Sequence, residues 1–424
     1  MGWAMALIPF ALLALGLPIF LILLVTVIVL LAFFMNVPFT VVPQTMFGSI
    51  DKFALLAVPF FIFAGEVMGQ GGISERLIRW VRSMFGGVRG SLALTTVGTC
   101  EFFGAISGSS PATVAAVGRI MYPALRADGY EEKFALGLVT SSGAIASIIP
   151  PSILMILYGA AAEQSVAALF IGGVFPGILI GILTAIYIVF YARGQALART
   201  EGFRWGTLCR STRDGAWALG TPVVILGSIY TGVCTPTEAA GIAGVYGIVV
   251  TRYVYRDITW GRLWDIAVSS VFLTAQIMII VAASGAFSWL LTISGVPQTV
   301  VGLIQGLNVP PWLMLVAVNA FLLIVGCLID PTSATLILTP LLVPIMRAIG
   351  VDLIHFGIIL TVNLSIGMFT PPFGLNLFVS QALFKAPMAR IARGLVPFIV
   401  IQVVALVMIT YVPWLSLYLT RFVR

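Results

Sequence analysis

The sequence predicts an all-α polytopic membrane protein of inverted-topology repeats, with two re-entrant helical hairpins and two helices broken at Pro-Pro pairs. Three observations predict this fold. Hydrophobic residues fill 60% of the 424 positions and charged residues only 9%. Two apolar segments are interrupted by short polar tips, and a Pro-Pro pair follows each of them. Motifs of the first half recur in the second half at a nearly constant offset.

The composition excludes a soluble protein. Soluble domains have about 25% charged residues, whereas apolar stretches, of which about 20 residues span a bilayer, fill almost this whole chain. The net charge of +7 comes mainly from arginines in short loops, which is the positive-inside pattern rather than a nucleic-acid surface. The four cysteines lie far apart, so they predict neither a disulfide framework nor a metal site.

Uninterrupted apolar segments define the expected membrane spans. The first covers 4–34, and its apolar run is too long for a signal peptide, so we interpret it as a retained span. The remaining spans are expected near 53–72, 134–160, 165–192, 214–233, 236–251, 265–291, 355–383 and 394–417.

Two further apolar segments, 92–123 and 311–347, carry a polar break near the middle. The breaks are Ser107–Pro111 in the first segment and Asp330–Ser333 in the second. Irregular backbone at membrane depth is tolerated only where protein or a water-filled cavity satisfies it. These segments are therefore expected to be re-entrant hairpins.

The two halves of the chain repeat each other. Ile149–Pro151 matches Thr370–Pro372 at an offset of 221. Three further matches occur in the same order, at offsets of 221 to 223: Tyr122–Pro123 with Val343–Pro344, Ala112–Thr113 with Ala334–Thr335, and Gly72–Ile73 with Gly295–Val296. We therefore divide the chain into a first repeat, 1–213, and a second part, 214–424, in which an extra span at 214–233 precedes the second repeat.

Loop charges indicate that the repeats are inverted. Only Arg347 is basic around the second hairpin, whereas seven basic residues surround the first: Arg76, Arg79, Arg82, Arg89, Arg119, Arg126 and Lys133. By the positive-inside rule, the first hairpin enters from the cytoplasm and the second from the opposite side. Inverted repeats recur in secondary transporters because two copies of one unit give two access states.

The Pro-Pro pairs lie in the spans 134–160 and 355–383, where they free backbone carbonyls from helical hydrogen bonds. Carbonyl and hydroxyl oxygens are ligands for a small cation. We therefore predict two sodium sites. The first comprises Ser107, Ser109, Ser110 and the break at Ile149 and Pro150, and the second comprises Asp330, Thr332, Ser333 and the break at Thr370.

Helix halves that restart after the tips would present positive dipole ends to a carboxylate. The candidate substrate-binding residues are Thr113, Ser152, Thr335, Asn363 and Asn376. A purely structural interpretation stays open for each of these polar residues, because serine, threonine and proline are common in membrane helix packing.

Four acidic residues lie in apolar sequence, Glu66, Glu101, Glu238 and Asp330, and intramembrane carboxylates usually face a cavity. Asp330 is the strongest functional candidate because it lies at a hairpin tip. Glu238 is explained equally well as a first-turn acidic residue. His355 is expected to be solvated or interfacial in a loop.

Enzymatic activity is not expected. None of the lysines follows a glycine, so the chain has no P-loop. A Ser/His hydrolase would need a serine to meet His355, which the expected topology separates from the hairpin tips.

Six motifs together resemble the large membrane subunit of the tripartite ATP-independent periplasmic (TRAP) transporters, essentially end to end. They are Glu101–Thr113, Gly129–Tyr130, Ile149–Ser152, Phe175–Gly177, Tyr230–Ala240 and Thr370–Asn376. The resemblance implies a sodium-driven importer of organic acids in the cytoplasmic (inner) membrane of a bacterium or archaeon. It implies sodium as coupling ion and no other cofactor. The implied sodium sites lie at the positions named above, and the resemblance adds Gly367 to the second site.

The resemblance also implies an elevator, in which a transport domain with both hairpins moves against a scaffold. The implied partners are a small four-helix membrane subunit, expected as a separate chain, and a periplasmic substrate-binding protein. C4-dicarboxylates, sialic acid, other sugar acids, keto acids and ectoine-like compounds are all open as substrates. Two alternatives remain: a stand-alone sodium/dicarboxylate symporter of another inverted-repeat family, and a passive channel.

Overall fold

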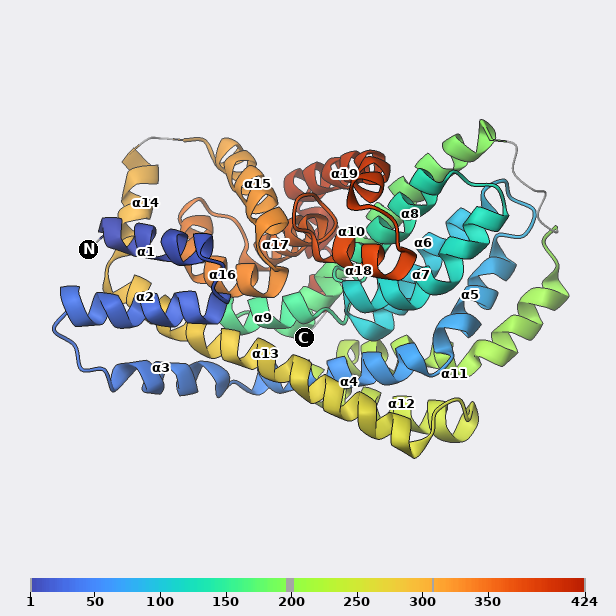
Figure 1. Cartoon of the computed structure of the whole chain (residues 1–424), viewed down its shortest axis with the longest axis horizontal. Coiled ribbons are helices and arrows are strands. Elements are labelled where there is room, and N and C mark those ends of the chain that lie inside the picture. The colour runs from blue at the N-terminus through green and yellow to red at the C-terminus, as the bar shows by residue number, and fades with distance from the viewer. Residues whose placement is uncertain (1, 196–201, 307–308, 423–424) are drawn as a thin grey trace.

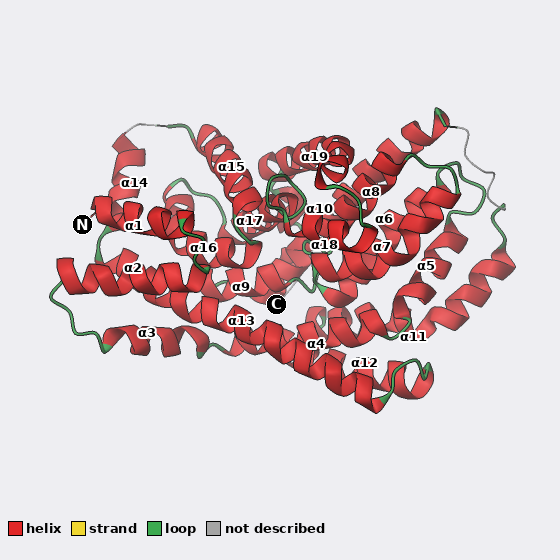
Figure 2. Cartoon of the chain, in the orientation of Figure 1, coloured by secondary structure: helices red, strands yellow, loops and turns green. Residues whose placement is uncertain are grey.

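The computed structural model describes residues 2–195, 202–306 and 309–422, and the described residues form helices with no strand (Figures 1 and 2). The helices of the first half are α1 (Gly2–Ala14), α2 (Ile19–Phe34), α3 (Val41–Ile50), η1 (Phe53–Leu56), α4 (Ala57–Gln70), α5 (Ile73–Met84), α6 (Ser91–Ser107), α7 (Ser110–Ala127), α8 (Glu132–Ile145), α9 (Ile153–Ala162) and α10 (Val166–Arg193). Those of the second half are α11 (Trp205–Tyr230), α12 (Pro236–Ile248), η2 (Val249–Val254), α13 (Trp260–Ile293), α14 (Val296–Gly306), α15 (Pro311–Leu328), α16 (Pro331–Ala348), α17 (Leu353–Gly367), α18 (Leu375–Phe384), α19 (Met388–Tyr411), α20 (Trp414–Leu417) and η3 (Leu419–Phe422).

Six helical segments within the described residues are long and apolar enough to cross a membrane. They are Phe53–Gln70, Val166–Arg193, Trp260–Ile293, Pro311–Leu328, Pro331–Ala348 and Met388–Tyr411. The fold is therefore that of a multi-pass helical membrane protein.

Helix ends recur between the two halves at the offset that the motifs predict. Helices α7 and α16 are offset by 221 residues at both ends. The broken span α8–α9 has its counterpart in α17–α18, offset by 221 or 222 residues. Both breaks contain a cis Pro-Pro peptide bond, at Pro150–Pro151 and Pro371–Pro372. Each half thus has a hairpin followed by a broken helix.

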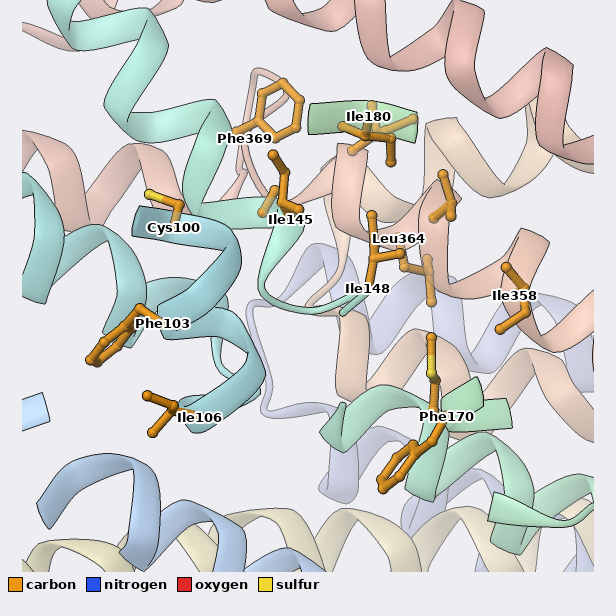
Figure 3. Close-up of a cluster of buried hydrophobic side chains, with 14 of the residues drawn as sticks. Cys100, Phe103, Ile106, Ile145, Ile148, Phe170, Ile180, Ile358, Leu364 and Phe369 are labelled. Carbon is orange, nitrogen blue, oxygen red and sulfur yellow. The ribbon is translucent and has the colours of Figure 1, made fainter. Parts of the chain in front are cut away.

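Both broken helices lie in one large hydrophobic core. Ile148 and Phe369, one from each break, are fully buried in it. Figure 3 shows these two side chains in the same cluster as Phe103 and Ile106 of α6. The packing therefore holds the breaks of both halves and the first hairpin in one body.

A second layer consists of α2, α3, α4, α12 and α13. The long helix α13 runs along one side of the molecule (Figure 1) and contacts α2, α3, α4 and α16. Helix α4 packs against α12 and α13 on one side and against α6 and α7 on the other. Helix α4 thus lies between this layer and the first hairpin.

The expected first span, 4–34, is not a single helix. It divides into α1 and α2, which pack against each other. Gly16 adopts a left-handed backbone with φ of 75°, and Pro18 immediately precedes α2. Glycine tolerates this conformation and proline favours a helix start, so the chain turns here despite its uniform apolarity.

The expectation for His355 is also wrong. His355 lies inside α17 with only 3% of its surface exposed. Its Nδ1 is 2.5 Å from the Ser416 hydroxyl, and its Nε2 is 3.2 Å from the Thr410 carbonyl oxygen. Asp352 accepts hydrogen bonds from the first backbone N–H groups of α17, so the helix starts before the histidine rather than after it.

Candidate functional site

The first hairpin tip packs tightly against the first helix break. Gly108, at the turn between α6 and α7, has φ of 58° and lies so close to Pro151 that an added Cβ would be 2.1 Å from its carbonyl oxygen. Gly104 similarly lies against Ala146, where a Cβ added to Gly104 would be 2.6 Å from the Ala146 Cα. Only glycines permit this approach, so the sequence of the tip determines its contact with the break.

The second tip contacts the second break in the same manner. Gly326 of α15 packs on Gly367 of α17, where an added Cβ on Gly367 would lie 2.3 Å from the Gly326 carbonyl carbon. The Phe373 N–H donates to the Cys327 carbonyl oxygen at 3.1 Å. The pairing of each tip with the break of its own half, which the sequence predicts, is thus found in the geometry.

Both breaks contain backbone carbonyls that have no hydrogen-bond donor in the part of the chain that the structure describes. Within the described residues, no hydrogen-bond donor is found for the carbonyls of 148–151 or of 369–372, which are equivalent segments at an offset of 221. The neighbouring Ser147 and Met368 carbonyls do have donors, the Ser152 hydroxyl at 2.5 Å and the Asn376 N–H at 2.8 Å. The proline-rich centre of each break therefore contains carbonyls that lack a donor in the described chain, of which those of Ile148 and Pro151 pack against Gly173 and Gly108.

The two tips face one cavity of about 500 Å³. Its polar wall contains Ser107, Gly108, Ser109, Ser110, Asp330, Thr332 and Ser333, together with Ser147 and Met368 from the breaks. Ser147 and Met368 are equivalent positions at an offset of 221, and the Ser147 hydroxyl donates to the Met368 sulfur at 3.5 Å. Residues of α2, α4 and α13 form the opposite, largely apolar wall.

Four helix N-termini meet at this cavity. Its lining includes Ser110 of α7, Ile153 of α9, Pro331 of α16 and Leu375 of α18, each in the first turn of its helix. The side chains of Ser152 and Asp330 cap α9 and α16, whereas α7 and α18 have no side-chain cap. Each N-terminus carries about half a positive charge, so the cavity favours an anion despite the carboxylates of Glu66 and Asp330 in its wall.

The first predicted sodium site is partly assembled around this cavity. Ser107, Ser109 and Ser110 line it, but Ile149 and Pro150 do not. The Ile149 side chain packs against Gly177, and Pro150 is buried. In this site the serines can offer hydroxyls, while the break can contribute only carbonyls.

In the second predicted site, Asp330, Thr332 and Ser333 line the cavity, whereas Gly367 and Thr370 do not. Asp330 Oδ2 accepts from the Ser333 N–H at 2.9 Å, and the buried Ser333 hydroxyl has no partner within the described chain. The Thr370 hydroxyl donates to the Ile366 carbonyl at 2.7 Å. A carboxylate and an unpaired hydroxyl are thus available at this tip.

The five residues predicted to bind substrate do not line the cavity. The hydroxyls of Thr113, Ser152 and Thr335 donate to backbone carbonyls four or five residues earlier. Asn363 donates to Asn319 Oδ1 at 2.7 Å, away from the tips. Their role in substrate binding stays a prediction without geometric support.

Asn376 has a different place, because it joins the two halves. Its amide donates to the Ser110 hydroxyl at 2.7 Å, and that hydroxyl donates to Asn376 Oδ1 at 3.0 Å. The first tip is therefore fixed to α18, the second half of the other broken helix.

The other acidic residues have distinct places. Glu238 forms a capping box with Thr235 at the start of α12, which confirms the first-turn interpretation. Glu101 packs against Gly181 of α10 and lines neither large cavity. Glu66 lines both the central cavity and a second one of about 470 Å³.

The sequence analysis did not identify Ser147 or Met368 as cavity residues, although the repeat offset of 221 could have paired them.

Comparison with known proteins identifies the family. The family model described as "Tripartite ATP-independent periplasmic transporter, DctM component" matches residues 6–415. The chain is 41% identical over 372 residues to the C4-dicarboxylate TRAP transporter large permease protein DctM of Pseudomonas aeruginosa, covering 88% of this chain and 87% of that one. It is 38% identical over 377 residues to the ectoine/5-hydroxyectoine TRAP transporter large permease protein UehC of Ruegeria pomeroyi, covering 89% and 88%.

Two further comparisons differ in extent. The isethionate TRAP transporter permease protein DctMQ of Oleidesulfovibrio alaskensis is 39% identical over 384 residues, which are 90% of this chain but only 60% of that protein. The crystal structure of the Alcanivorax borkumensis YdaH transporter has a TM-score of 0.62 at 16% identity, covering 88% of this chain and 87% of that one, and so shares the fold. The chain belongs to the DctM family of tripartite ATP-independent periplasmic transporters, the large, multi-pass membrane permeases.

Proposed function

We propose that this chain is the large subunit of a sodium-coupled secondary active importer of a small organic acid. The observation that carries the proposal is the central cavity, where four helix N-termini and two hairpin tips, each tip beside a break with free carbonyls, come together. Sodium would bind between tip and break, and the acid's carboxylate would use the helix N-termini. The cargo is a C4-dicarboxylate, sialic acid or a related acid, and the names of the relatives support this class.

The proposed transporter works with two partners in the cytoplasmic membrane of a bacterium or archaeon. A periplasmic binding protein delivers the substrate, and a small four-helix membrane subunit associates with the permease. The family description names a tripartite periplasmic transporter, which supports this assembly. Loops rich in arginine then lie in the cytoplasm, as in the positive-inside pattern.

Uptake into proteoliposomes tests the proposal. The permease is reconstituted with its small subunit, and the binding protein is added outside with radiolabelled malate, isethionate or ectoine. We expect accumulation only with an inward sodium gradient. Uptake that is unchanged when sodium is replaced by potassium would contradict sodium coupling, and uptake without the binding protein would favour a stand-alone symporter. Ion currents without substrate accumulation would favour a channel.

Alternating access in this proposal is an elevator movement of the hairpins and broken helices against the layer of α2, α3, α4, α12 and α13. A small cavity of about 120 Å³ lies at the far end of α13 from the arginine-rich loops, lined by Lys52, Ser288, Leu336 and Pro340 among others. Leu336 and Pro340 occupy positions equivalent to Ala115 and Arg119 of the 470 Å³ cavity, at the 221 offset. The cavities on the two sides thus differ greatly in size, which supports an inward-facing state.

Lys52 is expected to stabilise the closed periplasmic side. Its Nζ donates to the Ala160 carbonyl oxygen at 2.7 Å, near the negative end of α9, and so joins the α3–η1 connection to the broken helix. Because a hydrogen bond from a charged group contributes about 1.5–3 kcal/mol, Lys52→Met should favour the open periplasmic side by about tenfold. Labelling of a cysteine at Ser288 with an impermeant thiol reagent from outside should then accelerate.

The control for this prediction is Lys385→Met, which changes an exposed lysine after α18. The same chain without the introduced cysteine gives the background labelling. Equal labelling rates in K52M and K385M would show that the Lys52 contact does not hold this side closed.

Ser110→Ala is expected to lower sodium-driven uptake about tenfold while the permease stays folded. The substitution removes a tip hydroxyl and both of its hydrogen bonds with the Asn376 amide, which keeps only its bond to the Thr140 carbonyl oxygen at 3.2 Å. Loss of such an interaction costs about 1–3 kcal/mol. Uptake at several sodium concentrations, together with thermal unfolding of the purified protein, measures both effects.

Ser380→Ala provides a matched control, because Ser380 lies on α18 and bonds to Thr140 of α8 at 2.7 Å outside the cavity. This variant should retain uptake within about twofold of wild type, since an ordinary hydroxyl pair contributes about 1 kcal/mol to stability and no ligand to the cavity. Equal losses of uptake in S110A and S380A would attribute the effect to stability alone.

A further inference from the structure

The second large cavity continues from the central one. It has a volume of about 470 Å³, and Gly65, Glu66 and Ala112 line both cavities. Its lining comes from α4, α5, α6, α7 and the start of α13. Helix α4 contacts α5, α7 and α13, and arginines are frequent in α5, in α7 and at the start of α13. The second cavity therefore adjoins the one at the hairpin tips.

Two arginines line this second cavity, Arg119 of α7 and Arg262 of α13. Neither guanidinium group has an ion pair or hydrogen bond with another described residue. Among the described residues, the two ion pairs are Arg76–Asp257 and Arg390–Glu132. Arginine favours planar, bidentate binding of carboxylates, so two unpaired guanidinium groups at one cavity are suited to an organic acid.

The acidic residues of this cavity lie on other helices than the arginines. Glu66 lies on α4, where its Oε2 accepts from Gln70 at 3.0 Å, and Glu75 lies in the first turn of α5. The arginines come instead from α7 and α13. A carboxylate is thus favoured on the arginine side, and a hydroxyl or ammonium donor on the glutamate side.

The three charged residues that the first repeat contributes to this cavity have no charged counterpart in the second repeat. At the offset of 223 that pairs Gly72 with Gly295, Glu66 and Glu75 correspond to Trp289 and Gln298. At the offset of 221, Arg119 corresponds to Pro340, so none of the three counterparts is charged. The tips and breaks, by contrast, keep their polar character in both halves. The charged lining therefore belongs to one end of the pathway and not to the repeated architecture.

We propose that the second cavity is an exit site, in which Arg119 and Arg262 bind the carboxylate of the transported acid before its release to the cytoplasm. The proposal rests on the proposed function and adds a second binding step to it. Once sodium leaves, the carboxylate of Asp330, which lines only the central cavity, repels the acid, and the guanidinium groups of the second cavity attract it. Arg119 and Arg262 therefore favour acids over neutral solutes at the exit.

Inhibition of uptake by internal substrate tests the exit site. Proteoliposomes with wild type or the R119Q/R262Q variant are preloaded with malate, isethionate or ectoine, whichever the wild type accumulates. Sodium-driven uptake is then measured with the binding protein added outside only. Only permeases whose periplasmic side faces out of the vesicle can then take up substrate. We expect the internal concentration that halves uptake to rise about tenfold or more in the double variant, because charged hydrogen bonds to the rebinding acid are lost.

Two variants separate charge from structure. R119K/R262K keeps the positive charges and should recover much of the wild-type inhibition, whereas R79Q changes an exposed arginine of α5 outside both cavities and should match wild type. Wild-type inhibition in R119Q/R262Q would overturn the exit site while leaving sodium-coupled import intact. Absence of sodium-driven uptake in the wild type would instead overturn the proposed function, and the exit site with it.

Discussion

Asp330→Asn is expected to raise the sodium concentration for half-maximal uptake by about tenfold or more. Asp330 is the only acidic residue in the two hairpin tips, and it lines the central cavity. A bound sodium ion would lose its one anionic ligand at this tip, and interactions with a charged group contribute about 1.5–3 kcal/mol. The measurement is the initial rate of uptake into proteoliposomes across a range of external sodium concentrations.

Asparagine is chosen because it preserves the local structure. Asp330 caps α16 by accepting the Ser333 N–H, and asparagine caps helices about as well as aspartate. Asp352→Asn provides a matched control, because Asp352 caps α17 in the same way but lies outside the cavity. An unchanged sodium dependence in D330N would remove Asp330 from the coupling site.

The sequence predicted the tips and breaks accurately because their chemistry is local. Gly108 takes a positive φ that turns the first hairpin, and the Pro-Pro pairs end the α-helical hydrogen bonding wherever they occur. The helix ends at Ser107 and Leu328 therefore match the motifs at an offset of 221. Features of this kind need no knowledge of distant packing.

The candidate ligands could be predicted only in part, because a residue's type does not determine its partner. Serine and threonine in a helix often donate to the carbonyl four residues earlier. Thr113 and Thr335 do so here, whereas Ser107 and Ser333 lie at the tips and face the cavity. Position relative to the helix start decides between the two roles.

Other features depend on how distant segments pack. His355 bonds with Ser416, 61 residues away, and Asn376 bonds with Ser110, 266 residues away. No pattern within either segment contains the partner. The meeting of both tips at one cavity is of the same kind, since the repeat predicts two similar units but not their common contact at Ser147 and Met368.

Substitution of the glycines that pack the hairpins against the breaks is expected to cause the second large loss of uptake. Gly104→Val and Gly367→Val are each expected to destabilise the permease by about 1–3 kcal/mol and to reduce sodium-driven uptake severely. At Gly367 an added Cβ would meet the Gly326 backbone at 2.3 Å, and at Gly104 it would meet the Ala146 backbone at 2.6 Å. Backbone cannot rotate away as a side chain can, so the tip must separate from the break and its carbonyl ligands.

Thermal unfolding and uptake, measured on the same preparations, separate the two consequences of these substitutions. Gly241→Val is the matched control, because Gly241 lies in a helix of the outer layer and an added Cβ there meets nothing within 4 Å. If tip and break act together as a sodium site, the milder G104A and G367A variants should lose sodium affinity even where the protein stays folded. Wild-type sodium affinity in both folded variants would mean that close contact of tip and break is needed for packing and not for coupling.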